Sequence, residues 1–349
     1  MILILAEKND KSAYRVKEWI DHFQKKSLII EDDEEIKIKE IGINQEHSYF
    51  IIEYQHEEIH SDSITSVWIR RGFFKDGINS RDFTKEFVKI LDSNSLSLIH
   101  EFLNQEIHIV HFYLYYVLKK KRTLGRIAYP PLNKLIVLEE AVIVGLSIPK
   151  TKIVTNKKDL LNFYLENNNK IITKPISDCI QFTAKNKLYS FYTNRIIKSE
   201  IALMNNDFLY SLVQNQIDKK FELRIFFFKK KYYSMAVFSQ LDKNAKIDSR
   251  KFDNFSSTPS IPFNLPDKIQ NKLIKLTSNL KIDTGSIDMV VNKHGDYIFL
   301  EINPDGMFDM VSVLCNYKIE QDIAKYLIGS SSEQLLDCYK KISERQLNQ

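Results

Sequence analysis

The stretch SIDMVVNKHGDYIFLEINPDGMFDM, residues 286–310, decides the fold of the chain. Two runs rich in Ile, Val, Phe and Tyr, residues 286–292 and 297–303, are separated by Lys-His-Gly-Asp. Such runs with a glycine-containing connection are typical of a β-hairpin. We therefore expect two antiparallel strands here, joined by a turn at His294 and Gly295.

The expected register of this hairpin brings three polar side chains together. A two-residue loop and a four-residue loop give the same register, and both place Asp288 opposite Glu301. Asn303 follows two residues after Glu301, so the alternation of a strand returns its side chain to the same face. The sequence thus predicts two carboxylates and an amide on one face of the hairpin.

Two carboxylates in directly opposed positions require an explanation. Taken singly, Asp288, Glu301 or Asn303 is most simply a polar residue on a solvated strand face. Like charges on opposed residues destabilise a sheet, however, and a divalent cation removes that penalty. Carboxylate and amide oxygens are ligands that Mg²⁺ takes, together with water and substrate phosphates. The three residues together predict a magnesium site that serves a nucleotide.

Composition sets the class of protein. At 349 residues with 44% hydrophobic residues, the chain is long enough for two or three packed domains. No apolar run reaches 18 residues and no signal-peptide pattern is visible, so we expect a cytoplasmic protein without a membrane segment. Cys179, Cys315 and Cys338 are widely spaced, which indicates neither a disulfide framework nor a zinc site.

The net charge and the glycine content limit the classes of ligand that we expect the chain to bind. A net charge of +5 is modest for this length, so we expect no nucleic-acid partner, whereas an anionic ligand or an acidic peptide would suit the chain. The nine glycines form neither a G-x-x-x-x-G-K-[ST] nor a G-x-G-x-x-G pattern. Side chains must therefore hold any bound phosphate.

The rest of the chain alternates between strand and helix patterns. Residues 2–30 read as strand, helix and strand, which suggests an α/β unit. Helical spacing covers residues 84–121 with a break near 92–95, and a second helix is expected to end at Gly145. The segment 170–177 reads as a strand, and residues 219–239 as a hairpin with Glu222 and Arg224 on one face. We expect domains over residues 1–120, 121–205 and 206–349.

Four segments resemble ATP-grasp ligases. FLEINPDGMF is similar to the Leu-Glu-Ile-Asn-Pro strand of that family, and NKLIVLEEAVIVGLSIPKTKIVTN is similar to its entry helix. QNQIDKKFELRIFFF looks like its hinge with a Glu-x-Arg strand, and SVWIRRG like its Trp-x-Arg-Arg element. The resemblance extends over most of the chain and points to the graspetide synthetases, in particular the grasp-with-spasm and microviridin-type peptide ligases. It implies a mixed α/β ATP-grasp fold with N-terminal, central and C-terminal parts.

The resemblance also implies nucleotide-binding residues. Lys134 and Lys174 match the lysines that reach the nucleotide phosphates, and a lysine acts there as a point charge. Asn215 and Ile217 match the hinge whose backbone reads adenine, and Glu222 matches a residue at the ribose.

Catalytic and metal-binding roles follow from the same resemblance. Arg224 matches an arginine that faces the transferred phosphate, while Asp288, Glu301 and Asn303 match the metal ligands. Asp248 and Arg250 fall in a region similar to an Asp-x-Arg element near the active site. One departure is the segment ISDCIQFTAKN after Lys174, which lacks the glycines of the phosphate flap found in many ATP-grasp enzymes.

The implied activity uses ATP and Mg²⁺ to join side chains of a ribosomally made precursor peptide, composed of a leader and a core. An Asp or Glu carboxylate would become an acyl phosphate, which a Thr, Ser or Lys side chain would attack to give an ester or amide. Self-association as a homodimer is left open. One alternative is an ATP-grasp ligase that adds free amino acids to a protein tail or a small molecule. Another is a peptide-binding module with a degenerate nucleotide site.

Overall fold

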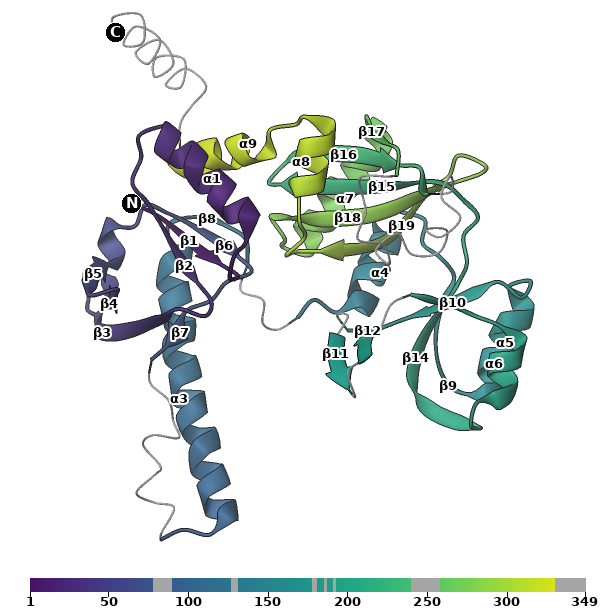
Figure 1. Ribbon diagram of the computed structural model, residues 1–349, viewed down its shortest axis with the longest axis horizontal. Helices are drawn as coiled ribbons and strands as arrows, with labels where there is room; N and C mark the ends of the chain where they lie inside the picture. Colours follow the sequence, from purple (N-terminus) through teal and green to yellow (C-terminus); the bar gives the residue numbers. More distant parts are fainter. Residues whose placement is uncertain are drawn as a thin grey trace, which may run out of the picture. The chain divides into compact units, whose positions relative to one another are not determined.

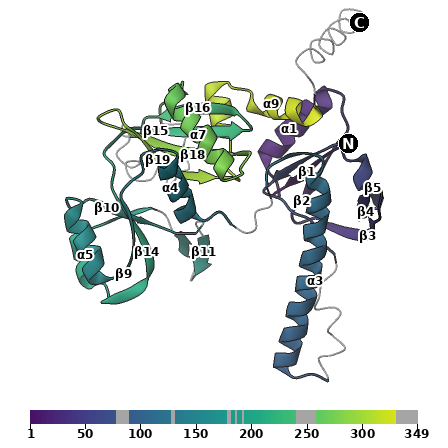
Figure 2. The same ribbon diagram turned by 180° about the vertical axis from the view of Figure 1, so that it is seen from behind.

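The computed structural model describes residues 1–77, 90–126, 131–177, 181–184, 187–190, 193–239 and 258–329. The chain divides into two compact units. The first unit contains residues 1–130 together with the segment from Lys318 onward, and the second contains residues 131–317 (Figures 1 and 2). No helix in the described ranges is both long and apolar enough to cross a membrane.

The first unit is built on a parallel sheet with strand order β2-β1-β6-β8. Its strands are β1 (Ile2–Ala6), β2 (Ser27–Glu31), β6 (Ser66–Arg70) and β8 (Arg122–Leu124). Helix α1 (Lys11–His22) begins at Asp10, whose carboxylate accepts hydrogen bonds from the N–H groups of the first turn. It packs against α9 (Ile319–Ile328), which the chain supplies from its far end (Figure 1).

A long helix and a second sheet complete this unit. The second sheet has the order β5-β4-β3-β7, formed by β3 (Glu35–Ile43), β4 (Ser48–Tyr54), β5 (Glu57–His60) and β7 (Lys75–Asp76), with a short 3₁₀ turn, η1 (Ser61–Ser63), after β5. Helix α3 (Ser93–Lys119) buries Leu114 and Leu118 near its end against Leu3 and Leu5 of β1. Its earlier turns leave large apolar side chains exposed.

The second unit contains two larger sheets and one hairpin. The smaller of these sheets has the order β13-β10-β14-β9 and is covered by α5 (Lys157–Glu166) and α6 (Lys198–Leu203). Its strands are β9 (Thr151–Asn156), β10 (Ile171–Lys174), β13 (Asn194–Ile196) and β14 (Asp207–Asn215). The hairpin pairs β11 (Gln181–Ala184) with β12 (Lys187–Ser190).

The larger sheet has the order β17-β16-β15-β18-β19. Its strands are β15 (Lys219–Phe228), β16 (Lys231–Val237), β17 (Ser260–Pro262), β18 (Thr284–Asn292) and β19 (Tyr297–Asn303). Helices α4 (Lys134–Ile143) and α7 (Asp267–Asn279) cover one face, against Leu223, Ile225 and Phe227. On the other face Phe226 packs on Phe308, which precedes α8 (Asp309–Cys315), with ring centroids 4.9 Å apart.

These elements confirm the predicted α/β fold class and most predicted segments. Helix α4 starts after Asn133, whose side chain caps its first N–H groups, and ends before Gly145, whose φ of +79° suits glycine at a helix end. The predicted break near residues 92–95 is the start of α3, where Asp92 caps the helix. Cys315 is buried, whereas Cys179 and Cys338 lie outside the described residues.

The predicted hairpin register is correct at the polar residues and wrong near the turn. There, Val291 pairs with Tyr297, one residue away from the expected Asn292–Tyr297 pair. A β-bulge at Leu300 adds one residue to β19 and restores the expected pairing of Asp288 with Glu301. The turn geometry alone could not reveal this bulge, because a bulge depends on the neighbouring strands.

The C-terminal boundary also differs from the expectation. We expected residues 206–349 to form one subdomain, but α9 belongs to the first unit. The hydroxyl of Ser66 donates to the Leu327 carbonyl at 2.6 Å, and that of Tyr326 donates to the Thr123 carbonyl at 3.1 Å. The finer division at residues 120 and 205 stays a prediction.

Candidate active site

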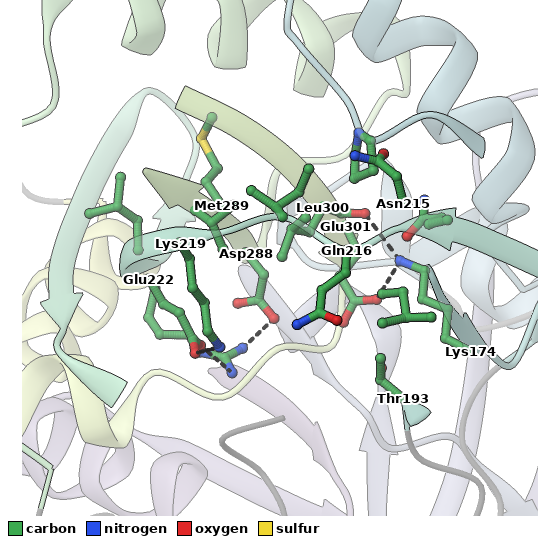
Figure 3. A pocket seen from close by; sticks show the side chains of 17 residues that line it. Lys174, Thr193, Asn215, Gln216, Lys219, Glu222, Asp288, Met289, Leu300 and Glu301 are labelled. Atoms are coloured by element: carbon green, nitrogen blue, oxygen red, sulfur yellow. Dashed lines mark hydrogen bonds and ion pairs between the residues drawn. The ribbon is translucent and has the colours of Figure 1, made fainter. Parts of the chain in front are cut away.

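A pocket opens between the two larger sheets of the second unit (Figure 3). The end of β10, the connection from β14 to β15, and facing residues of β15, β18 and β19 form its walls. Of the residues proposed from the sequence, seven line this pocket: Lys174, Asn215, Ile217, Glu222, Arg224, Asp288 and Glu301. Segments more than 120 residues apart thus meet in one place, which the sequence order alone does not require.

The bulge in β19 shapes the acidic side of the pocket. Two consecutive residues of a regular strand point to opposite faces, but Leu300 and Glu301 both line the pocket. The bulge accounts for this, because two of its residues oppose the single residue Asp288. An apolar side chain and a carboxylate are therefore presented side by side.

Each of the two opposed carboxylates has a cationic partner. Arg224 lies opposite Asp288 on the neighbouring strand, and its guanidinium donates to the Asp288 carboxylate. Lys174 Nζ lies 3.6 Å from Oε2 of Glu301 and donates to the Leu300 carbonyl at 3.4 Å. These four charged side chains are only 10–22% exposed. Arg224 and Lys174 therefore also offset the repulsion between the carboxylates, which we expected a divalent cation to relieve.

Glu222 stands at the centre of a second charged group. Lys219 Nζ lies 2.5 Å from its Oε1, the Ser239 hydroxyl donates to the same oxygen at 2.6 Å, and Arg224 lies 3.8 Å from its Oε2. Burial raises the pKa of Glu222, but the nearby Lys219 and Arg224 and the hydrogen bonds outweigh it and hold the pKa below its ordinary value. Glu222 is therefore an ionised, fixed partner of Arg224.

The connection from β14 to β15 forms the hinge side of the pocket. The Lys150 N–H donates to Oδ1 of Asn215 at 2.7 Å, and the Asn215 N–H donates to the Lys150 carbonyl at 3.1 Å. These bonds fix the hinge backbone beside the lining residue Ile217. The buried Oε1 of Gln216 has no hydrogen-bond partner among the described residues. Apolar side chains complete this side: Pro149, Ile172, Leu223, Met289, Val290 and Leu300.

Asn303 ends β19 two residues after Glu301 and is absent from the described pocket lining. It pairs with Ser286 on β18, and its Oδ1 accepts a hydrogen bond from the Asp305 N–H at 2.9 Å. The turn then brings Gly306 so close to Ser286 that an added Cβ would lie 2.0 Å from its hydroxyl oxygen. Oδ1 keeps a second lone pair, so the amide is still able to bind a cation.

The remaining residues proposed from the sequence are not among those that line the pocket in the described ranges. Lys134 lies at the start of α4, where its Nζ donates to the Ser177 carbonyl at 2.6 Å, and it is absent from the pocket lining that the structure describes. Ser177 follows Lys174 by three residues, which places Lys134 near the end of β10. Asp248 and Arg250 lie outside the described residues.

The donor set fits a magnesium ion that also binds a ligand. No cluster of three His, Cys, Asp or Glu side chains suited to a metal occurs within the described ranges. Asp288 and Glu301 offer two carboxylates on adjacent strands, and Asn303 offers an amide on the same face. Mg²⁺ usually takes one or two protein carboxylates and completes its shell with water and phosphate. Two carboxylates are therefore enough when a nucleotide supplies the other ligands.

Sequence reasoning did not single out the other residues of the pocket lining, among them Lys219, Gln216 and Leu300. The spacing of Lys219 from Glu222, three residues on a strand, gives no signal, because a bulge between Lys219 and Phe221 changes the faces. Only the three-dimensional structure brings these side chains into the pocket.

Comparison with solved structures shows that the chain has the ATP-grasp fold, in the form found in ligases of ribosomally made peptides. One similar structure is a Chryseobacterium gregarium RiPP-associated ATP-grasp ligase in complex with ADP and a leader and core peptide. It has a TM-score of 0.74 and 23% identity over 95% of this chain and 97% of that one.

Two further structures have the same fold. The macrocyclase MdnC of Microcystis aeruginosa, bound with the precursor peptide MdnA, has a TM-score of 0.72 and 24% identity over 95% of this chain and all of that one. The ATP-grasp ligase PsnB, complexed with a minimal precursor, Mg and ADP, has a TM-score of 0.67 and 13% identity over 94% and 96%. No protein-family model and no curated protein sequence matches the chain.

Proposed function

We propose that the chain is an ATP-dependent ligase that cross-links side chains of a ribosomally made precursor peptide. The observation that carries this proposal is the pairing of Asp288 with Glu301 beside Lys174 and Arg224, in a pocket bounded by the hinge. Two carboxylates for a metal, cations for phosphates and an apolar wall for a base are the parts that a magnesium–nucleotide site requires. Structures of the same fold contain ADP, Mg and precursor peptides, which supports this reading.

The hinge and the apolar wall would hold the nucleoside. Backbone groups of Asn215 and Ile217 would pair with the edge of adenine, while Ile172, Met289 and Leu300 would contact its faces. The unpartnered Oε1 of Gln216 would accept a hydrogen bond from the base or the ribose, because a buried acceptor without a partner costs free energy that a ligand donor recovers.

The charged residues would act on the phosphates. Lys174, with Lys134 nearby, would bind phosphate oxygens, and Arg224 would face the phosphate that is transferred. Bound Mg²⁺ would neutralise phosphate charge and orient the nucleotide for transfer. Asp288 and Glu301, with Asn303 at the edge, would hold that ion. Glu222 keeps Arg224 in place through its own ion pair.

The proposed reaction has two steps, phosphorylation of a peptide carboxylate and then transfer of its acyl group. A peptide carboxylate oxygen attacks the γ-phosphorus of ATP, which releases ADP and forms an acyl phosphate. A side-chain hydroxyl or amine then attacks the acyl carbon, loses its proton and releases phosphate, which leaves an ester or an amide. The peptide loses the elements of one water for each bond formed. Positioning and electrostatics supply most of the catalysis, as in other phosphoryl transfers.

The two alternative functions make different demands on the same pocket. A ligase for free amino acids would need the same nucleotide residues and would increase the mass of its acceptor. A peptide-binding module with a degenerate site would have no use for paired carboxylates beside paired cations. The intact set of Asp288, Glu301, Lys174 and Arg224 favours an active ligase over that module.

Co-expression with a short precursor encoded beside the gene tests the proposal. We expect the precursor to lose the mass of one water per cross-link with the wild-type chain, and to stay unchanged with Glu301→Gln. A precursor without its leader should react much more slowly, and the leader added separately should restore part of the rate, because a short core offers little binding energy for positioning. An unmodified precursor, or a mass gain of an amino acid, would contradict the proposal.

A second copy of the chain is the partner that α3 best fits. Five large apolar residues of α3 are at least half exposed, and they form what we call the α3 stripe: Leu98, Phe102, Ile109, Phe112 and Tyr116. They follow the spacing of alternating three and four residues, with Gln105 at the one polar position, which is the pattern of a two-helix coiled coil. The same stripe on two copies is self-complementary about a twofold axis. We propose that α3 mediates a homodimer.

A further inference from the structure

The charges that line the pocket balance without any ligand. Among the described lining residues, the cations are Lys174, Lys219 and Arg224, and the anions are Glu222, Asp288 and Glu301. Three positive charges therefore match three negative ones. Adding Mg²⁺ alone would leave an excess of two positive charges, and adding ATP alone an excess of about four negative ones. Together, the metal and the nucleotide leave an excess of about two negative charges, half of that left by ATP alone.

The two carboxylates among the proposed metal ligands are already engaged by cations. Glu301 has Lys174 at 3.6 Å, and Asp288 has the guanidinium of Arg224. Arg224 is fixed on the other side by Glu222, on the same strand, which in turn has Lys219 at 2.5 Å. Lys174 differs from Arg224 because it reaches Glu301 from another sheet, at the end of β10 (Figure 3). We therefore expect a bound phosphate to displace Lys174 from Glu301 more easily than it displaces Arg224 from Asp288.

We propose that Lys174 is an exchangeable counter-ion that holds Glu301 until a nucleotide arrives. This proposal rests on the proposed function of the pocket. Without nucleotide, the ammonium of Lys174 pairs with Glu301 and disfavours metal binding there. Phosphates then attract Lys174, which exposes Glu301 to the metal. The same lysine thus suppresses the binding of metal alone and promotes the binding of the metal–nucleotide pair.

The consequence is positive coupling between the two ligands. A ligand shifts an equilibrium only by its different affinity for the two states, and the coupling between two ligands is reciprocal. In one of the two states Lys174 pairs with Glu301, and in the other it pairs with a phosphate of the nucleotide. Nucleotide binding should therefore increase metal affinity beyond the contribution of the direct phosphate–metal contact, and metal should do the same for nucleotide. Such an arrangement disfavours a metal-loaded site that lacks ATP.

Titration of the nucleotide-free protein with Mn²⁺ tests the proposal, with free Mn²⁺ measured by its electron paramagnetic resonance signal. Lys174→Gln removes the charge and keeps a polar side chain of similar length. We expect it to raise the affinity for Mn²⁺ alone by roughly tenfold, within the range usual for coupled sites. Lys170→Gln is the matched control, because it removes a lysine that is 49% exposed and paired with Asp218. That variant should match the wild type.

A double variant shows whether Glu301 is the ligand that Lys174 blocks. The gain in Mn²⁺ affinity from Lys174→Gln should disappear when it is combined with Glu301→Gln, since position 301 then has no carboxylate that the loss of Lys174 could free. Circular dichroism spectra of all variants should match that of the wild type, so that lost structure is not mistaken for lost binding.

Two results would overturn the proposal. One is an unchanged or weaker affinity for Mn²⁺ alone in Lys174→Gln, and the other is a gain that persists in the double variant. A separate measurement of Mn²⁺ binding in the presence of ADP distinguishes this failure from failure of the proposed function. If the wild type binds Mn²⁺ with ADP but Lys174→Gln shows no gain without it, only the counter-ion role is rejected. If no Mn²⁺ binds under either condition, the metal site itself is rejected.

Discussion

At the scale of single residues, the pocket is held together by ion pairs that differ in their freedom to change partners. Glu222 has three partners on its own sheet or close to it, namely Lys219, Arg224 and Ser239. Glu301 pairs with Lys174, which comes from a different sheet. We therefore assign Glu222 mainly to the stability of the site and Glu301 mainly to ligand binding, and the two assignments predict different effects of substitution.

Glu301→Gln should abolish most of the ligase activity while the fold stays intact. The substitution removes one carboxylate from the metal, and the loss of one preorganised electrostatic group usually costs about 100-fold or more in rate. Because Glu301 is partly exposed and its amide replacement still accepts hydrogen bonds, we expect the melting temperature to change little. The measurement combines ATP-dependent mass change of the precursor with calorimetric melting. Unfolding of the variant under conditions where the wild type is folded would indicate a structural role instead.

Glu222→Gln should lower the stability of the chain near neutral pH. The substitution leaves Lys219 and Arg224 without the negative charge that they pair with. We expect this loss to cost about 1–3 kcal/mol, as for other buried polar groups. The folded-state pKa of Glu222 lies below its ordinary value, so its contribution is fully present above the pKa of the unfolded state. That contribution is lost as the pH falls through the folded-state pKa.

Urea unfolding at pH 7 and at acidic pH tests this assignment. The stability difference between the wild type and Glu222→Gln should shrink as the pH is lowered below about 4, near the pKa of a glutamate in an unfolded chain. A difference that stays constant across this range would show that the ionised form of Glu222 contributes nothing.

At the scale of elements, the bulge in β19 is the feature that sequence patterns could not supply. The pattern of residues 286–303 was enough to predict the hairpin, and the register expected from its loop placed Asp288 opposite Glu301. The turn nevertheless pairs Val291 with Tyr297, and the correct pairing at the site depends on the extra residue Leu300. A bulge arises from contacts with neighbouring strands, which the sequence of one hairpin does not contain.

Leu300→Ala tests the role of this bulge. The bulge turns Leu300 into the pocket beside Glu301, so loss of its side chain should remove an apolar contact with the nucleotide base. We expect a five- to tenfold weaker affinity for ADP, which corresponds to about 1–1.5 kcal/mol of lost apolar burial. Leu203→Ala, at a leucine that is 88% exposed in α6, provides the control and should bind ADP like the wild type. Equal affinity in both variants would remove Leu300 from the base-binding wall.

The α3 stripe makes a second prediction at this scale. Phe102→Glu combined with Phe112→Glu places charges at two heptad positions, so the chain should sediment as a monomer at concentrations where the wild type is a dimer. Leu165→Glu, at an equally exposed leucine of α5, should leave the dimer unchanged. A monomeric wild type would contradict the proposed homodimer and would make the stripe available to a peptide instead.

At the scale of the whole molecule, the sequence predicted the class of fold and several residues of the pocket. It did not predict which side chains of the pocket form ion pairs with one another. The Leu-Glu-Ile-Asn-Pro strand and the hinge carry local patterns, so their residues could be identified one by one. The ion pairs of Lys174 and Lys219 join elements that only the folded chain brings together. For the same reason, the packing of α9 in the first unit could not be predicted, since its contacts with α1, β6 and β8 join distant parts of the chain.

In the proposed function, residues from β10, the hinge and the β18–β19 hairpin form a single site for a magnesium–nucleotide complex. Calorimetric titration of ADP in excess Mg²⁺ tests it most directly. We predict one site per chain, with affinity reduced at least tenfold in Lys174→Ala and in Glu301→Gln, because each loses a charged contact worth roughly 1.5–3 kcal/mol. Lys170→Ala should bind like the wild type. Absence of ADP binding, or equal affinity in all four proteins, would show that these residues do not form one nucleotide site.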